Sequence, residues 1–484
     1  MAKVKRLYII GAGFAGRTLA NEIHRKAIFG EVVAFLDDDP EKIGKKIDSI
    51  PVLGPIKDVT GFIRSSRADE AIIAIPSAGR EYLKELYSIL KKANFNKIRI
   101  LPGISQIIEG DAHLIQTRSI DLQDLLGRNP VTIKLKQSLS YVRGKRVLVT
   151  GAGGSIGSEI CRQLLSGGVS RLYLLGHGEN SIYQIDRELR LLQDEGVGEK
   201  AAIVPIIGDL KDASYMEYIL KNLKADAIFH TAAYKHVPLM EENPVAAIEN
   251  NVFGTENLIN AAIKNGIKRF VHISTDKAVN PLSVYGVSKY ICEQLVLSAS
   301  ENTGKGNPNF VVVRFGNVLG SRGSIVPLFQ KQIEKGGPVT VTHPDARRYF
   351  MTISEACSLV LMTGGVGENG GLYLLDMGEP VRITDFAEQM IRFHGYEPET
   401  EIKIEYIGLR SGERLDESLL SQDEIPSLTD YSRILRINRK TPNTIDIEKL
   451  LNELRPICTM DPSQPQFYRN SEKLKSIIKT TLEK

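Results

Sequence analysis

Apolar residues in the first part of this chain recur in short runs, each followed by glycine or polar residues, with amphipathic stretches between them. Four of these runs predict β-strands, at residues 7–10, 32–36, 70–75 and 97–101. The stretch over residues 81–93 predicts an amphipathic helix. Alternation of strands and helices is typical of a parallel sheet with helices on its faces.

The same alternation returns further along the chain. Six apolar runs predict parallel strands, at residues 147–150, 171–175, 202–207, 227–231, 269–274 and 310–314. Helical stretches such as residues 155–166 and 244–265 separate them. The runs are apolar nearly throughout, which indicates a sheet covered on both faces. After Arg314 the alternation weakens into loops rich in glycine, proline and arginine, which suits a smaller substrate-binding portion.

Two strand–glycine–helix openings divide the chain into domains. They begin at Gly11 and at Gly151, and each predicts the start of a Rossmann-like domain. The expected fold class is therefore α/β, with two doubly wound parallel sheets. The expected organisation is a nucleotide-binding-type domain over 1–130, a linker over 131–143, a catalytic domain over 144–430 with a substrate-binding portion after 315, and a C-terminal extension over 431–484. The extension ends in a Lys-rich stretch near 472–484, which we expect to be a solvated helix.

Composition excludes several classes of protein. Of 484 residues, 42% are hydrophobic and 25% are charged, which is typical of a globular chain. The formal net charge of +4 does not indicate a nucleic-acid partner. The four cysteines form no Cys-x-x-Cys pair, so we expect no metal site and a reducing, cytoplasmic compartment. The short N-terminal apolar run predicts a strand rather than a signal peptide, and no run approaches the ~18 residues of a membrane-spanning helix.

The two glycine loops predict phosphate sites, because a tight turn without Cβ atoms lets a phosphate approach the free N–H groups of the next helix. In the second loop, Gly151, Gly154 and Gly157 have a spacing that resembles the short-chain dehydrogenase/reductase superfamily. The first loop has the spacing G-x-G-x-x-G, which also fits a turn that holds no ligand. For the first domain we expect a binding or assembly role without catalysis.

The second loop and the strand ends that follow it predict a nicotinamide dinucleotide site. The cofactor-binding residues that we expect are Gly151, Gly154, Ser155, Ile156, Gly157, Asp209, Leu210, Ala232, Ala233 and Lys289. Asp209 stands where the superfamily carries an Asp near the adenine, and Ala232 and Ala233 are small enough for close approach. Gly176 occupies the strand end where an Asp would select NAD, so the choice between NAD and NADP stays open.

Tyr285 and Lys289 form the candidate catalytic pair. They stand at positions i and i+4 of a predicted helix, so both side chains lie on one helix face. A phenol titrates near ~10, and an ammonium group one turn away would lower that pKa. Tyr285 could then remove a hydroxyl proton while hydride leaves the carbon for the nicotinamide.

Asp276 and Lys277 add groups that a simple dehydrogenase does not need. They follow a predicted strand that ends in Ser274 and Thr275. A carboxyl group and an amine beside the reacting sugar offer an acid and a base for moving further protons. The pair therefore suggests elimination of water, and a solvated pair in a loop is the alternative.

Motifs with a family signature lie along the second domain. They include His230-Thr-Ala-Ala-Tyr-Lys-His-Val-Pro238, Ser274-Thr-Asp-Lys-Ala-Val-Asn-Pro281, Arg314-Phe-Gly-Asn-Val-Leu-Gly320 and Gly408-Leu-Arg-Ser-Gly-Glu-Arg414. With the second glycine loop they resemble the bacterial UDP-N-acetylglucosamine 4,6-dehydratases of polysaccharide biosynthesis, a family of extended short-chain dehydrogenases. The first domain resembles the nucleotide-binding-type domain of the long members, and residues 35–54 resemble part of some sugar acyltransferases.

The resemblance implies an enzyme that converts UDP-N-acetylglucosamine to a UDP 4-keto-6-deoxy sugar for surface polysaccharide or glycan biosynthesis. Tightly bound NAD or NADP would take hydride from C4 and return it to C6, and so be regenerated in each turnover. Tyr285 with Lys289 would deprotonate the 4-hydroxyl, and Thr275 would hydrogen-bond the 4-oxygen. Lys277 would take the C5 proton, and Asp276 would protonate the departing 6-hydroxyl. The implied substrate-binding residues are Lys235, His236, Asn317, Arg348 and Arg410, and a structural role is the alternative for His236.

Two other functions stay open. A UDP-N-acetylglucosamine 4-epimerase would share the cofactor, Tyr285 and Lys289 but would not need Asp276 and Lys277. A non-catalytic nucleotide-sugar sensor would not need the intact catalytic set. We expect a homo-oligomer that binds a UDP-sugar and no nucleic acid. Long family members usually begin with transmembrane helices, which this chain lacks, so we expect a cytoplasmic protein, or one held at the cytoplasmic face of the membrane by an anchor outside this chain.

Overall fold

The chain forms two compact units in the computed structural model. The structure describes residues 6–26, 30–62, 69–75, 80–95, 97–100, 118–119, 138–198, 200–301, 308–394, 396–440 and 445–482. The first unit contains Met1–Thr132, Phe329–Val339 and Phe386–Glu405, and the second contains Ile133–Leu328, Thr340–Asp385 and Tyr406–Lys484. Two segments that we expected in the substrate-binding portion are thus grouped with the first unit. The expected domain boundary near residue 130 lies outside the described residues.

A mainly parallel sheet forms the core of the first unit, with the strand order β3-β4-β2-β1-β5-β6-β7. Its strands are β1 (Arg6–Ile10), β2 (Glu31–Leu36), β3 (Lys46–Ile47), β4 (Ile50–Leu53), β5 (Asp69–Ile73), β6 (Lys97–Ile100) and β7 (Arg118–Ser119). The helices among them are α1 (Phe14–Lys26), η1 (Ile56–Asp58), α2 (Val59–Phe62) and α3 (Arg80–Lys92). Leu19 and Ile23 of α1 share an apolar cluster with Leu7 and Ile9 of β1, which explains why these runs are buried. The four predicted strands and the predicted helix are confirmed.

The second unit is built on a nine-stranded sheet with the order β10-β9-β8-β11-β12-β13-β18-β22-β21. Its strands are β8 (Arg146–Thr150), β9 (Arg171–Gly176), β10 (Ala202–Ile207), β11 (Ala227–His230), β12 (Arg269–Ile273), β13 (Asn309–Arg314), β18 (Gly371–Leu375), β21 (Glu424–Leu428) and β22 (Ile434–Arg439). The strands from β10 to β18 are parallel. The six strands predicted from apolar runs are all in this sheet, and the doubly wound α/β fold class is confirmed.

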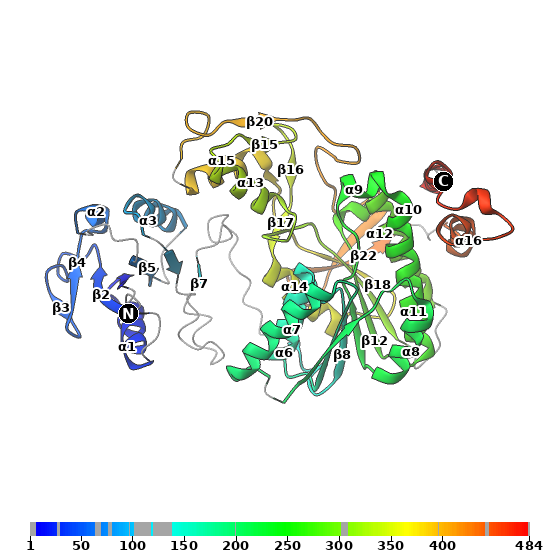
Figure 1. The fold of residues 1–484 in the computed structure, drawn as a ribbon, viewed down its shortest axis with the longest axis horizontal. Coiled ribbons are helices and arrows are strands. Elements are labelled where there is room, and N and C mark those ends of the chain that lie inside the picture. Colours follow the sequence, from blue (N-terminus) through cyan, green and yellow to red (C-terminus); the bar gives the residue numbers. More distant parts are fainter. Residues whose placement is uncertain are drawn as a thin grey trace. The chain divides into compact units, whose positions relative to one another are not determined.

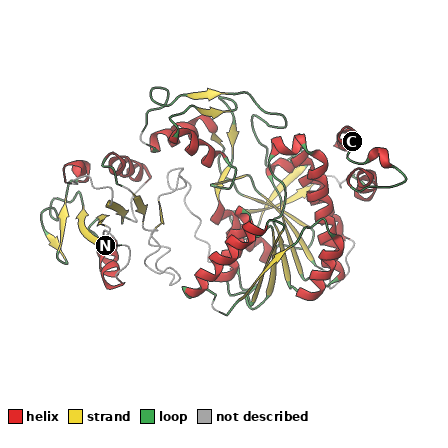
Figure 2. Ribbon diagram, viewed as in Figure 1, coloured by secondary structure: helices red, strands yellow, loops and turns green. Residues whose placement is uncertain are grey.

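Helices cover both faces of this sheet, as its apolar strands require (Figures 1 and 2). One face carries α6 (Ser155–Ser166), α7 (Glu179–Asp194) and α14 (Ile353–Val366). The other carries α8 (Ala213–Leu223), α11 (Gly254–Lys264) and α12 (Val284–Glu301). The helix predicted over 244–265 consists of α10 (Pro244–Ala247), the π-helical turn η3 (Ile248–Phe253) and α11.

Shorter elements complete the chain. They are α9 (Val237–Glu242), η4 (Asp276–Ala278), β14 (Asn317–Leu319), α13 (Ile325–Glu334), β15 (Val339–Val341), β16 (Arg347–Arg348), β17 (Phe350–Thr352), β19 (Val381–Arg382), α15 (Ile383–Phe393), β20 (Ile404–Tyr406), α16 (Ile447–Cys458), η5 (Pro465–Phe467) and α17 (Ser471–Leu482). Within the described part of the chain, no helix combines the length and the apolar content needed to cross a bilayer.

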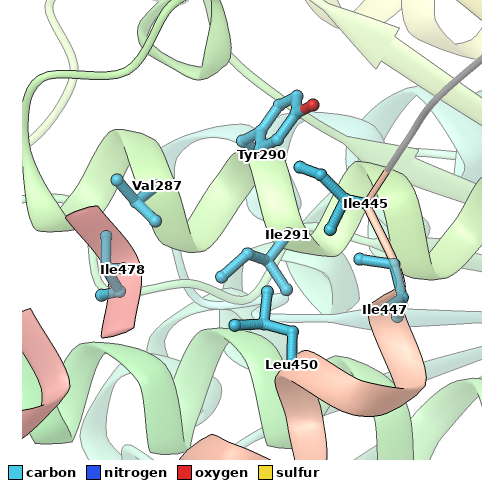
Figure 3. Close-up of a pocket in the computed structure, with 7 residues that line it drawn as sticks. All are labelled: Val287, Tyr290, Ile291, Ile445, Ile447, Leu450 and Ile478. Atoms are coloured by element: carbon cyan, nitrogen blue, oxygen red, sulfur yellow. The ribbon is translucent and has the colours of Figure 1, made fainter. Parts of the chain in front are cut away.

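The C-terminal residues belong to the fold of the second unit. β22 pairs with β18 in antiparallel orientation and β21 pairs with β22, so residues on both sides of position 430 lie in one sheet. The expectation of a solvated C-terminal helix is wrong, because Leu474, Ile477 and Ile478 of α17 are buried in the core cluster that includes α12. A small apolar pocket marks this contact (Figure 3). Its lining residues are Val287, Tyr290, Ile291, Ile445, Ile447, Leu450 and Ile478.

Candidate active site

The glycine loop between β8 and α6 forms a turn that requires residues without side chains. Gly151 has φ +64°, and a Cβ on Gly157 would lie 2.2 Å from the Gly151 carbonyl oxygen. Gly154 is the N-cap of α6 and makes no side-chain cap to the N–H groups of the first turn. Open amides at a helix N-terminus suit a phosphate, so the loop fits a dinucleotide cofactor.

The ends of β8 and β11 meet beside this loop. A Cβ on Gly151 would lie 2.8 Å from Ala232 Cα, and the Thr231 hydroxyl donates a 2.7 Å hydrogen bond to the Thr150 carbonyl. The chain builds outward from β8 to β9 and β10 on one side and returns to β11 on the other side. Such a switch point, at the carboxyl ends of parallel strands, is the usual ligand crevice of this fold.

The other expected cofactor residues lie at neighbouring strand ends. Asp209 is partly exposed, and its Oδ1 accepts a 3.0 Å hydrogen bond from the Lys211 amide. Leu210 is buried, and its carbonyl accepts a 3.0 Å hydrogen bond from the Asn257 side chain. Ala233 is partly buried and follows Ala232 in the loop after β11. Asp209 and Leu210 thus follow β10, and Ala232 and Ala233 follow β11, at the carboxyl ends of these strands.

The helix α12 carries Tyr285 and Lys289 one turn apart, and both side chains are buried. Lys289 Nζ donates a 2.6 Å hydrogen bond to the Ile273 carbonyl and lies 3.0 Å from His272 Nε2. The Tyr285 hydroxyl is close enough to the Thr275 side chain for Thr275 to lower the pKa of the phenol. Both side chains of the pair therefore reach the carboxyl end of β12.

The expectation that Lys289 lowers the pKa of Tyr285 is wrong for this structure. Burial raises the pKa of Tyr285 to about 12, and the opposing effects come from the positive charge of Lys277 and from the hydrogen bond with Thr275. Burial also lowers the pKa of the Lys289 ammonium. The phenol is therefore a weaker acid here than the helix spacing suggested.

Asp276 and Lys277 lie in η4, directly after β12, and they bond to each other. Asp276 Oδ1 accepts hydrogen bonds from Thr275 Oγ1 at 2.9 Å and from Lys277 Nζ at 3.1 Å. Its Oδ2 is buried and has no hydrogen-bond partner among the described residues. The pair is thus hydrogen-bonded to Thr275 and largely removed from solvent, and the idea of a solvated loop pair is wrong.

The Lys277 ammonium is surrounded by acceptors. Besides Asp276, its Nζ lies 3.3 Å from Asn317 Oδ1 and 3.4 Å from Glu417 Oε1. Arg348 Nε lies 3.8 Å from the same Glu417 oxygen. Asn317 and Arg348, which the sequence suggested as substrate-binding residues, therefore lie in one cluster with Asp276, Lys277 and Glu417. Sequence reasoning missed Glu417, which is one of many acidic residues after the last family motif and carries no local signal.

Lys235, His236 and Arg410 are exposed. Although these side chains reach solvent, desolvation by the surrounding protein lowers the pKa of Lys235 and of His236. The Arg410 amide donates a 3.1 Å hydrogen bond to Glu413 Oε2. Within the part of the chain that the structure describes, no hydrogen bond or ion pair joins these three side chains to the Asp276–Lys277 pair.

Buried polar residues behind the catalytic pair were also missed. His272 is fully buried, its Nε2 faces Lys289, and burial lowers its pKa well below the ordinary value. Asn251 of η3 accepts from the Tyr234 amide at 2.8 Å and donates to Ser288 Oγ at 2.9 Å. Asn251 thereby ties the loop after β11 to α12.

Arg322 contacts the glycine loop from a distant segment. Its amide donates a 3.0 Å hydrogen bond to Ser155 Oγ, and its guanidinium donates one of 3.0 Å to the Gly153 carbonyl. A cation at this position adds to the suitability of the loop for a pyrophosphate.

Comparison with known families gives two matches. The family described as "Polysaccharide biosynthesis protein" matches residues 147–439, which contain every candidate site residue. The family described as "CoA-binding domain" matches residues 2–102.

Individual relatives support the first match. The chain is 41% identical to "Capsular polysaccharide biosynthesis protein CapD" of Staphylococcus aureus over 93% of this chain and 74% of that protein. It is 32% identical to "UDP-N-acetylglucosamine 4,6-dehydratase (inverting)" of Campylobacter jejuni over 58% of this chain and 79% of that protein. Among solved structures, Pen from Bacillus thuringiensis is similar with a TM-score of 0.56 and 31% identity, over 63% of this chain and 90% of that one.

Proposed function

This chain belongs to the polysaccharide biosynthesis protein family of extended short-chain dehydrogenases, and we propose that it is a nucleotide-sugar 4,6-dehydratase that acts on UDP-N-acetylglucosamine. The observation that carries the proposal is the ion pair of buried Asp276 and partly buried Lys277, to which Thr275 is hydrogen-bonded and whose Lys277 charge acts on Tyr285. An epimerase needs one proton moved at C4, whereas a dehydratase needs an acid and a second base as well. A relative named as a dehydratase and relatives named as UDP-glucose 4-epimerases are similar to this chain to the same extent, so the choice between the two activities rests on the Asp276–Lys277 pair.

The nicotinamide cofactor is part of this proposal. The glycine loop from Gly151 to Gly157, with Ala232 and Ala233, would hold it, and Asp209 would lie toward its adenosine. When bound, the nicotinamide supplies a hydride acceptor for C4 of the sugar and a hydride donor for C6. Gly176 at the end of β9 leaves the choice between NAD and NADP undecided.

In the first half-reaction, Tyr285 removes the proton of the 4-hydroxyl. With a pKa of about 12 the phenol is protonated at neutral pH, so proton removal depends on the two groups that lower this pKa, the positive charge of Lys277 and the side chain of Thr275. Lys289 is held by the Ile273 carbonyl and His272, which fixes its ammonium behind the phenol on the same helix face.

In the second half-reaction, Lys277 takes the C5 proton and Asp276 protonates the leaving 6-hydroxyl. These roles require a neutral amine and a protonated carboxyl group. The 3.1 Å hydrogen bond between Lys277 Nζ and Asp276 Oδ1 lets one proton pass from the Lys277 ammonium to the Asp276 carboxylate. This single transfer gives the neutral amine and the protonated carboxyl group together. Elimination then returns the pair to its charged form, and Lys277 returns a proton to C5 as hydride reaches C6.

We assign the binding of the UDP portion of the substrate to polar residues around the Asp276–Lys277 pair. Asn317 and Arg348 lie beside Lys277 and Glu417, and a guanidinium suits the oxygens of a diphosphate. Arg410, Lys235 and His236 are exposed and available to a bound nucleotide.

Product analysis tests the proposal. The purified protein is incubated with UDP-N-acetylglucosamine, and the product is examined by mass spectrometry and NMR. Loss of one water, a 4-keto signal and no net consumption of cofactor are expected. An isomer of unchanged mass would instead identify a 4-epimerase, and binding without conversion would identify a sensor. A requirement for stoichiometric NAD or NADP would contradict the return of the hydride.

For the first unit we propose binding without catalysis. Its glycine loop is bonded to an acidic strand end, since the Ala12 amide donates a 2.7 Å hydrogen bond to Asp37 Oδ2. An acid at this position can accept hydrogen bonds from a ribose. Calorimetry of the full chain with coenzyme A, NAD(P) and UDP-sugars, compared between wild type and Asp37→Ala, tests the proposal. Heats that do not differ between the two proteins would favour a scaffold role.

A further inference from the structure

Glu417 is a buried carboxylate that no role assigned so far uses. Its side chain is 5% exposed, and it comes from the segment between β20 and β21, far in sequence from η4. One of its oxygens, Oε1, faces two cations, Lys277 Nζ at 3.4 Å and Arg348 Nε at 3.8 Å. A carboxylate this deeply buried is costly unless it is paired, so its position is set by those cations.

Arg348 holds the segment that carries Glu417. Its guanidinium donates hydrogen bonds of 2.9 Å to the Leu415 carbonyl and 2.7 Å to the Arg414 carbonyl. These carbonyls lie just before Glu417 in the chain. Arg348 therefore contacts both the Glu417 carboxylate and the backbone that precedes Glu417.

The groups that face Lys277 come from four parts of the unit. They are Asp276 of η4, Tyr285 of α12, Asn317 of β14 and Glu417. Burial lowers the pKa of the Lys277 ammonium, but Asp276 and Glu417 outweigh burial, so the pKa is raised above its ordinary value. Lys277 Nζ thus donates hydrogen bonds to Asp276 and Asn317 and forms an ion pair with Glu417.

We propose that Glu417 is a positioning residue for the dehydration half-reaction, which holds Lys277 charged and oriented between turnovers and connects it to the diphosphate-binding Arg348. The inference rests on the proposed function, because it assigns Glu417 a part in the acid–base chemistry of Lys277. When a diphosphate binds to Arg348, the Arg348 guanidinium would be drawn away from Glu417. The interaction of Glu417 with the base Lys277 would then depend on whether substrate is bound. The C4 oxidation machinery, Tyr285 and Lys289, has no bond to Glu417 in the described structure.

The test compares Glu417→Gln, Glu417→Asp and the control Asp416→Asn, which changes an exposed neighbour. Two steps are measured separately across pH. Reduction of bound nicotinamide by UDP-N-acetylglucosamine reports C4 oxidation, and uptake of deuterium at C5 from D2O reports the Lys277 step. In Glu417→Gln the pH midpoint of C5 exchange should move about one unit lower, because one charge that holds Lys277 protonated is lost. The rate of C4 oxidation should stay within about 3-fold of wild type, since an intact phenol carries that step.

The two other variants separate charge from structure. Glu417→Asp keeps the carboxylate and should keep the wild-type midpoint, and Asp416→Asn should match wild type in both steps. An unshifted midpoint in Glu417→Gln, or equal slowing of both steps, would overturn the proposal.

If the proposed function itself is wrong, the wild-type protein will show neither C4 oxidation nor deuterium uptake at C5. This outcome differs from every outcome that concerns Glu417 alone. In that case the titration of Lys277 is followed directly by NMR of protein labelled with carbon-13 at the lysine ε position, with assignment by Lys277→Ala. Its midpoint should still fall in Glu417→Gln, and an unchanged midpoint would again overturn the role of Glu417.

Discussion

Lys277 donates a 3.1 Å hydrogen bond to Asp276 Oδ1, while Asp276 Oδ2 is buried and lacks a hydrogen-bond partner among the described residues. A buried oxygen without a partner is costly, and a catalytic role is one of the reasons for which such a group occurs in a native structure. A hydroxyl leaving group is a suitable ligand, because Oδ2 could carry the proton that the hydroxyl needs. The relationship between these two residues leads to separate predictions for the base, the acid and the phenol.

Replacement of the base should separate the two half-reactions. Lys277→Ala should lower C5 exchange about 10²-fold or more, because the base is lost. It should slow C4 oxidation less, through loss of the charge that opposes the high pKa of Tyr285. Reduced nicotinamide should therefore accumulate in the presence of substrate, as measured by its fluorescence. Lys264→Ala, at an exposed lysine paired with Glu217, is the control, and wild-type turnover by Lys277→Ala would exclude the role.

Replacement of the acid should block loss of water but not proton removal. In Asp276→Asn the amide cannot supply the proton to the 6-hydroxyl. Deuterium should still enter C5, while formation of the 6-deoxy product should fall about 10²-fold or more. Mass spectrometry of the recovered UDP-sugar distinguishes uptake of deuterium at C5 from loss of water. Equal loss of exchange and dehydration would mean that Asp276 acts mainly by holding Lys277.

From the raised pKa of Tyr285 we expect the rate of C4 oxidation to depend on pH. Because the pKa of Tyr285 is raised to about 12 and the deprotonated form is the base, the phenolate fraction rises with pH throughout the neutral and mildly alkaline range. The single-turnover rate of nicotinamide reduction should rise with it. Tyr285→Phe should abolish the step and its pH dependence. A rate that is flat from pH 7 to pH 9 in the wild type would contradict the assignment of Tyr285 as the titrating base.

We expect substitution of Arg314, the cation of a buried ionic cluster, to lower the stability of the protein strongly. Arg314 is almost completely buried and bonds to Glu293 at 2.6 Å and to Glu424 of β21 at 2.8 Å. Arg314→Met would leave two buried carboxylates without their cation, which should lower the free energy of unfolding by about 3–5 kcal/mol. Arg190→Met removes a half-exposed pair with Asp186 and should cost about 1 kcal/mol or less. Urea unfolding of both variants gives the comparison, and similar midpoints would show that the cluster is not stabilising.

The same cluster connects stability to the site. Glu293 also accepts a 2.6 Å hydrogen bond from Ser274, the residue before Thr275. Arg314→Met should therefore also impair both half-reactions, and a variant that unfolds earlier yet retains full activity would separate the two roles.

The sequence by itself determined the parts of the protein that depend on local geometry. The turn at Gly151 and Gly157 follows from the absence of Cβ atoms, and the shared face of Tyr285 and Lys289 follows from the helix repeat. The alternating apolar runs were sufficient for the doubly wound sheets, because strands buried on both faces must be apolar throughout. The resemblance to a family then implied Asn317 and Arg348 as substrate-binding residues, and this role stays a prediction.

Only the tertiary structure decided which distant residues complete the site and what charges they carry. Glu417 and His272 have no periodicity or spacing that distinguishes them from other acidic or histidine residues, and they meet Lys277 and Lys289 only when the chain folds. The pKa of Tyr285 was wrongly expected because helix spacing gives the direction of two side chains but not the extent of their burial. β22 joins the main sheet by pairing with β18, a contact between remote segments that local sequence does not encode, since hydrogen bonds between strands form from the backbone of any residue except proline.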